Sequence, residues 1–144
     1  MQALPHLYRA SAVAAPEGLV TLSSPGLSEL PSAPPTEFDG SGDRWSPETL
    51  VAAALGDCLV LTFRAVAKAS KLEWTSLRCE VEGTLDRVDG AMRFTRFDTK
   101  ATLVLPPGIE EARARRVLEK AERNCIISAS LKPESRVELT IVVG

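Results

Sequence analysis

The stretch from Ser46 to Lys71, SPETLVAAALGDCLVLTFRAVAKASK, constrains the fold more than any other part of the chain. Its first residues fit a helix start: a capping hydroxyl, a proline at the first helical position and a carboxylate near the positive end of the dipole (Ser46, Pro47 and Glu48). From Leu50 to Phe63 the predicted helix is apolar almost all the way round, with a cysteine, Cys58, in its middle. A helix without a polar face is normally buried on every side.

This helix also predicts how the chain assembles. A small domain covers one face of a central helix with its own sheet, so the other face needs a second layer. A partner subunit is the simplest source of that layer. The sequence therefore predicts an obligate homodimer with this helix near the interface.

Length and composition set the class of protein. With 144 residues and 44% hydrophobic content, the chain is expected to form one domain, residues 1–144, around one core. The net charge of −2 gives no basic excess that would favour nucleic acid or a membrane surface. The apolar run looks too short and too interrupted to span a bilayer, and the first residues lack a signal-peptide pattern. We expect a soluble, cytoplasmic protein.

The cysteines limit the chemistry. There are three, Cys58, Cys79 and Cys125, all far apart, and the single histidine is His6. A structural zinc site needs four such ligands, and a disulfide framework is not expected in a cytosolic chain of this length. The sequence predicts neither a metal nor a bound cofactor, and leaves single thiols as the reactive groups.

The remaining elements follow from alternation and turn residues. Strands are predicted over 7–14 and 19–23, with a short edge strand near 27–30 inside the Pro-rich loop 24–43. A long hairpin follows over 76–88 and 91–105, joined at Asp89-Gly90 and with a bulge in its second strand. A charged amphipathic helix over 109–124, a helical turn over 126–133 and a strand over 136–143 complete an α+β chain with a mostly antiparallel sheet.

Two of the thiols are candidates for chemistry. Cys58 is either a small buried hydrophobe or a reactive thiol, and reactivity would need a cation, for which Arg9 and Arg44 are the upstream choices. Cys125 is either a core residue at a helix end or a second thiol. The pair could cycle between dithiol and disulfide if their Cα atoms lie within about 7 Å. Cys79 is interpreted as a core residue of its strand.

Two carboxylates lie near Cys58 in the sequence. Glu48, taken alone, is a helix-start residue. It precedes Cys58 by ten residues, about 15 Å along a straight helix, so a role at such a thiol would be at the other subunit's site. Asp57 would raise the pKa of the neighbouring thiol unless it faces away.

Two segments, GDRWSPETLVAAALGDC and ERNCIISASLK, resemble the OsmC/Ohr superfamily. Its members carry a Pro-Glu helix start, an Ala-rich run ending in a cysteine and a second cysteine after the next helix, usually followed by proline. The resemblance covers the chain from about Phe38 to its end. Two departures indicate a divergent branch: Ile126 follows Cys125, and the first turn, 15–18, lacks the arginine of the hydroperoxide reductases.

The resemblance implies an intertwined homodimer in which antiparallel sheets pack around two long helices. It implies a thiol-dependent peroxidase of the oxidative stress response that reduces organic hydroperoxides and is recycled by a lipoyl-type dithiol. Carried onto this chain, Cys58 is the peroxidatic thiol, Cys125 the resolving thiol and Glu48 the carboxylate that positions an arginine. Arg44 is the best substitute for the missing arginine, and a structural role at the dimer surface is its alternative.

Two rival interpretations stay open. One is a non-peroxidase dimer of this superfamily that binds a small apolar ligand or acts as a redox sensor. The other, a protein-interaction module, gains little from a chain without long charge runs or heptads.

Overall fold

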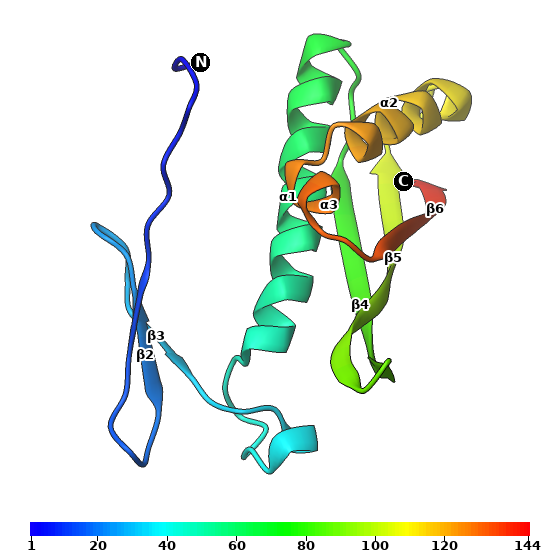
Figure 1. Cartoon of the computed structure of the whole chain (residues 1–144). Coiled ribbons are helices and arrows are strands. Elements are labelled where there is room, and N and C mark those ends of the chain that lie inside the picture. Colours follow the sequence, from blue (N-terminus) through cyan, green and yellow to red (C-terminus); the bar gives the residue numbers. More distant parts are fainter. The chain divides into compact units, whose positions relative to one another are not determined.

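The computed structural model describes residues 1–144, which divide into two compact units, Met1–Leu50 and Val51–Gly144 (Figure 1). Helix α1 (Pro47–Ala69) begins in the first unit and continues into the second. The two units are described in turn.

The first unit is built on a small antiparallel sheet of order β1-β2-β3, from β1 (Ser11–Val13), β2 (Val20–Ser23) and β3 (Leu30–Ser32). The predicted first two strands are present, although the first is shorter than 7–14. The third lies slightly later than expected. Three short strands bury little surface, and all of β1 is exposed. A sheet of this size is marginal without something packed on it.

The Pro-rich loop is ordered by local contacts. Ala33 N–H donates to the Trp45 carbonyl oxygen at 2.9 Å, which ties together the two ends of the segment that holds the short helix η1 (Thr36–Phe38). Gly40 is needed within it, because a Cβ there would lie 1.7 Å from the carbonyl oxygen of Pro34.

The start of α1 is capped as the sequence predicts. The Ser46 hydroxyl accepts the Thr49 N–H at 3.1 Å, and the Thr49 hydroxyl accepts the Ser46 N–H at 2.9 Å. This reciprocal pair is a capping box with threonine in the place of the usual glutamate.

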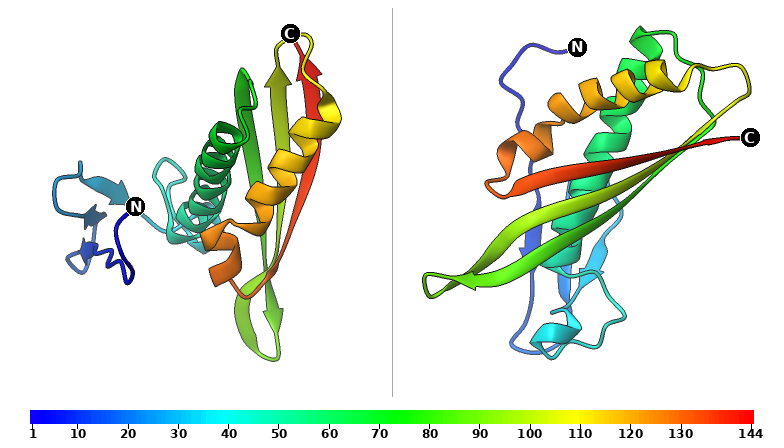
Figure 2. Two further views of the ribbon diagram at one scale, coloured as in Figure 1. Left: turned by 90° about the horizontal axis from the view of Figure 1, so that it is seen from above. Right: turned by 90° about the vertical axis from the view of Figure 1, so that its right-hand side faces the viewer.

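The second unit is a three-stranded sheet covered on one face by helices (Figure 2). Strands β4 (Ser76–Val88) and β5 (Ala91–Leu105) form the predicted hairpin around Asp89-Gly90. Both of these turn residues have a positive φ. The predicted bulge is also present, because Thr84 pairs with Arg96 and Leu85 with Phe94, which leaves Thr95 without a partner.

The last strand differs from the expectation of antiparallel sheets. Strand β6 (Glu134–Val143) pairs with β5 in parallel, so this sheet is mixed. The reason is the crossover between them. Helices α2 (Glu111–Arg123) and α3 (Ile126–Ser130) carry the chain back to Arg96 of β5, where β6 begins, and a parallel pair requires such a connection. Only α1, with 23 residues, is long; α2 has 13.

The core lies between the helices and the inner face of this sheet. One apolar cluster joins α1, α2 and the far end of the hairpin, with Phe63 and Trp74 in an edge-to-face contact at 5.2 Å between ring centroids. A second apolar cluster is formed by Leu55, Phe97 and Cys125 and by the side chains packed against them. Gly83 makes room for it, because a Cβ there would lie 2.8 Å from the Phe97 ring and 2.9 Å from the Phe94 ring.

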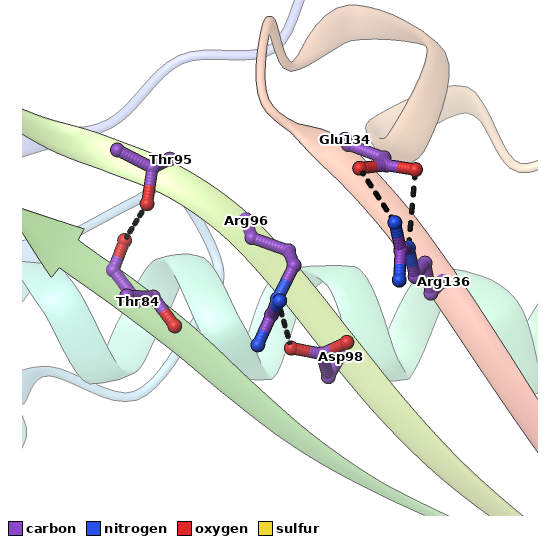
Figure 3. Close-up of polar contacts among 6 residues, drawn as sticks. All are labelled: Thr84, Thr95, Arg96, Asp98, Glu134 and Arg136. Carbon is purple, nitrogen blue, oxygen red and sulfur yellow. Dashed lines mark hydrogen bonds and ion pairs between the residues drawn. The ribbon is translucent and has the colours of Figure 1, made fainter.

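The outer face of the mixed sheet is polar. Figure 3 shows ion pairs between Arg96 and Asp98 at 2.6 Å and between Arg136 and Glu134 at 3.1 Å, and the Thr95 hydroxyl donating to the Thr84 carbonyl at 3.3 Å. These pairs are exposed and add little stability. They make this face a solvated surface.

Helix α1 buries one stripe against the sheet, formed by Leu55, Gly56, Leu59, Phe63 and Ala67. Its most apolar 18-residue window has a mean hydropathy of 1.8, and 28% of that window is buried. By length and composition alone the helix is long and apolar enough to cross a bilayer, which the interrupted run did not lead us to expect. The core helix of a soluble protein passes the same test. Within one chain, α1 is therefore not buried on every side.

Candidate dithiol site

Cys58 lies in the middle of α1, at the edge of its buried stripe, and is half-buried. Thr62, one turn later, lies beside it. The Thr62 hydroxyl donates to the Cys58 carbonyl oxygen at 2.7 Å, and its oxygen is 3.9 Å from the Cys58 sulfur. This places a hydroxyl at the thiol without any long-range contact.

Cys125 lies at the break between α2 and α3 and is 2% exposed. The Asn124 N–H bonds back to the last turn of α2, and Cys125 then becomes the N-cap residue of α3. Its side chain joins the apolar cluster of Leu55 and Phe97, against which Cys58 and Ile127 also pack. The structure thus brings together the two thiols that the sequence singled out.

The environments of the two thiols shift their pKa values in opposite directions. Burial works to raise the pKa of Cys58, but the Ile127 N–H, the Cys125 thiol, the Thr62 hydroxyl and the Ile126 N–H together lower it. Burial raises the pKa of Cys125, and the neighbouring Cys58 adds to that rise, while the N–H groups of Ser128 and Ile127 oppose it. The pair therefore holds one thiol suited to ionise and one suited to stay protonated.

The third cysteine is near but inert. Cys79 lies on the inner face of β4, under Gly56 of α1. Burial, together with the charge of a Cys125 thiolate, raises the pKa of Cys79 to about 11. A thiol with that pKa carries almost no thiolate near neutral pH.

No arginine is among the groups that lower the Cys58 pKa. Arg44 and Arg9 both belong to the first unit, where Arg44 is exposed and donates to the Asp43 carbonyl oxygen at 3.3 Å. Asp57 is exposed and is not among the groups that shift the Cys58 pKa. An arginine was the group expected to lower the Cys58 pKa. Within the single chain, main-chain N–H groups lower it instead.

Glu48 lies in the first turn of α1, and its Oε2 is buried with no hydrogen-bond partner. Buried carboxylate oxygens nearly always accept a hydrogen bond. This oxygen has no donor within the single chain.

Sequence reasoning missed the main-chain donors at Cys58. The signal was available at Asn124-Cys125, where one helix is predicted to stop and a helical turn to start. The first N–H groups of a helix have no partner within it and point toward whatever precedes the helix. Ile126 in place of proline supplies one N–H more.

The fold and the site define a class: an α+β protein with a pair of cysteines in one apolar cluster, one half-buried on a central helix and one buried beside it. A family model described as OsmC-like protein matches residues 40–140. The chain belongs to this family.

Relatives and solved structures agree with the assignment. The chain is 27% identical over 118 residues to the peroxiredoxin OsmC of Escherichia coli, covering 82% of this chain and 81% of that protein. It is 27% identical over 115 residues to the uncharacterized protein YmaD of Bacillus subtilis, covering 76% and 77% of the two chains. An organic hydroperoxide resistance protein OsmC from Legionella pneumophila matches with a TM-score of 0.74 at 26% identity, over 97% of this chain and 98% of that one. An OsmC-like protein of unknown function from Vibrio cholerae matches with a TM-score of 0.87 at 17% identity, over 94% and 100%, a likeness of fold alone.

Proposed function

We propose that the protein is a thiol-dependent peroxidase that reduces organic hydroperoxides through Cys58 and Cys125. The observation that carries the proposal is that Cys58 and Cys125 pack into one apolar cluster, with main-chain N–H groups at Cys58 that lower its pKa. The peroxiredoxin OsmC and the hydroperoxide resistance protein to which the chain is similar support a peroxiredoxin-like role in general.

In the first step the Cys58 thiolate attacks one oxygen of the hydroperoxide. An S–O bond forms, the O–O bond breaks and an alkoxide leaves, which takes a proton to become the alcohol. Cys58 is now a sulfenic acid. The lowered pKa of Cys58 favours this step, because only the thiolate is nucleophilic enough.

In the second step Cys125 attacks the sulfur of the sulfenic acid. A disulfide forms and water leaves, which protects Cys58 from further oxidation. A dithiol of the lipoyl type then exchanges with the disulfide, which restores both thiols and oxidises the reductant. The apolar side chains around the pair, such as Val51, Phe94 and Leu131, favour an alkyl or lipid-like peroxide.

The proposal includes a homodimer in which Glu48 and an arginine complete the partner's site. The unpaired Oε2 of Glu48 is a suitable acceptor for a guanidinium, and exposed Arg44 is the arginine that we propose for it. We further propose that the protein works in the cytoplasm, where free thiols persist.

The test is consumption of cumene hydroperoxide with dihydrolipoamide as reductant. Cys58→Ser should abolish turnover, and Cys125→Ser should allow a single turnover at most. Cys79→Ser is the matched control and should keep the wild-type rate, because that thiol is inert. Mass spectrometry after turnover should find a Cys58–Cys125 disulfide. Full activity in Cys58→Ser would refute the mechanism.

A second candidate is a dimer of the same family that binds a small apolar ligand or senses oxidants without turnover. The first turn, 15–18, which carries no arginine, favours it. No consumption of peroxide, with both thiols still free afterwards, would select this candidate.

A further inference from the structure

The hydroxyl of Thr62 lies against the Cys58 thiol, and the reaction cycle described above does not use it. The two residues are one helical turn apart, so they share one face of α1. The Thr62 Oγ1 is 3.9 Å from the Cys58 sulfur and 2.7 Å from the Cys58 carbonyl oxygen. Both residues are half-buried, so the core does not seal either of them. A hydroxyl is therefore within reach of the attacking sulfur.

Thr62 stands in a stretch that is otherwise built for packing. From Leu50 to Phe63, α1 is apolar apart from Gly56, Asp57 and Thr62. Gly56 is explained by the close approach of β4, because a Cβ there would lie 3.1 Å from the Val81 side chain, and Asp57 is exposed. A β-branched threonine is a poorer helix former than the alanines and leucines around it. Helix stability gives no reason for this residue, whereas its place beside the thiol does.

The hydrogen bond that Thr62 now makes is easily given up. Its hydroxyl donates to the Cys58 carbonyl oxygen, a bond that threonines within helices often form. In an α-helix the same oxygen also accepts the main-chain N–H four residues later, which is that of Thr62 itself. The carbonyl oxygen therefore keeps one donor when the hydroxyl rotates about its C–O bond. The hydroxyl can turn its proton toward a new acceptor at little cost.

We propose that Thr62 binds the hydroperoxide, its hydroxyl donating a hydrogen bond to the oxygen that leaves when Cys58 attacks. This inference rests on the proposed function and adds a donor to its first step. There the S–O bond forms as the O–O bond breaks, and negative charge moves from the sulfur to the leaving oxygen. A donor aimed at that developing charge lowers the barrier. The hydroxyl keeps its own proton, and the alkoxide takes one from solvent.

Thr62 is suited to this role because its proton can move with the charge. The N–H donors at Cys58, those of Ile126 and Ile127, are fixed by the backbone. The Cys125 thiol can rotate, but it is a weak donor and is consumed in the second step. The leaving oxygen lies only one O–O bond beyond the oxygen under attack, which keeps it near a hydroxyl that already lies beside the sulfur.

The test compares two reactions of the same thiolate. For each variant, kcat/KM for cumene hydroperoxide, with dihydrolipoamide as reductant, is divided by the rate constant for iodoacetamide alkylation of Cys58 at the same pH. The division removes any change in the thiolate fraction, since only the thiolate reacts in either case. Iodide, the leaving group of the alkylation, is a poor hydrogen-bond acceptor and gains little from a hydroxyl. Thr62→Val should lower this ratio by about tenfold, the worth of one hydrogen bond to a charged group.

Thr62→Ser is the matched control. It keeps the hydroxyl and loses the methyl group, whereas Thr62→Val keeps the branched shape and loses the hydroxyl. The serine variant should keep the wild-type ratio. A residue that served only packing would show the opposite order, with valine tolerated and serine impaired. An unchanged ratio in Thr62→Val, or a ratio in Thr62→Ser as low as that in Thr62→Val, would overturn the inference.

Failure of this inference is distinguishable from failure of the proposed function. If the wild-type protein consumes hydroperoxide and Thr62→Val has the same ratio, the peroxidase proposal stands and only the role of Thr62 is wrong. If the wild-type protein is alkylated at Cys58 but consumes no hydroperoxide, both proposals are wrong.

Discussion

At the scale of single residues, the reactivity of Cys58 depends on which main-chain atoms face it. Ile126 is the first residue of α3, its side chain is 72% exposed, and its N–H is one of the groups that lower the Cys58 pKa. Proline is well tolerated at the first position of a helix, so Ile126→Pro removes this N–H with little other change. We expect the pKa of Cys58 to rise, because the thiolate loses a hydrogen-bond donor.

The measurement is the rate of iodoacetamide alkylation of Cys58 as a function of pH, with the site identified by mass spectrometry. Since the thiolate reacts, the rate rises as pH passes through the Cys58 pKa, and that midpoint should move to higher pH in Ile126→Pro. Ile126→Ala, which keeps the N–H, should retain the wild-type midpoint. Equal midpoints in the two variants would show that the Ile126 N–H does not act on the thiol.

At the scale of elements, a glycine in β4 decides how the hairpin supports the site. The rings of Phe94 and Phe97 lie over Gly83, with centroids 4.9 Å apart, and flank the cluster that holds both thiols. Gly83→Ala would force a ring to move and should lower the free energy of unfolding by about 1–3 kcal/mol, as overpacking does. Chemical denaturation at one fixed protein concentration measures this.

A double-mutant cycle controls for other effects of the alanine. Phe94→Leu removes part of the ring that the new methyl group would meet, so the cost of Gly83→Ala should be smaller in that background. Strictly additive costs would mean that the clash is not the cause.

Much at this scale could be predicted from the sequence, and the failures have physical reasons. The capping residues at Ser46, the Asp89-Gly90 turn and the bulge near Thr95 all leave local signals, and all were predicted. The parallel pairing of β6 leaves none, because alternation fixes which face a residue takes but not the direction of its neighbour strand. The main-chain donors at Cys58 were missed because backbone N–H groups carry no side-chain signature, and only the helix break at Asn124-Cys125 indicates them.

At the scale of the whole molecule, the apolar surface of α1 predicts the assembly. Only 28% of its most apolar window is buried, and Leu61, in the middle of the helix, is 50% exposed. A surface of this kind marks an interface, and a second copy of the chain is the occupant that a closed two-fold assembly would supply. We expect a dimer in solution. Leu61→Glu should shift it toward monomer, since a carboxylate buried without a partner costs several kcal/mol.

Sedimentation velocity over a range of protein concentrations measures this shift. The matched control is Thr140→Glu on the outer face of the mixed sheet, where charged side chains already lie, and it should leave the dimer intact. If completion of the site by the partner's Glu48 is also correct, the monomeric Leu61→Glu protein should lose peroxide turnover while Thr140→Glu keeps it. A wild-type chain that sediments as a monomer at all concentrations would contradict the prediction, and the exposed face of α1 would then need another partner.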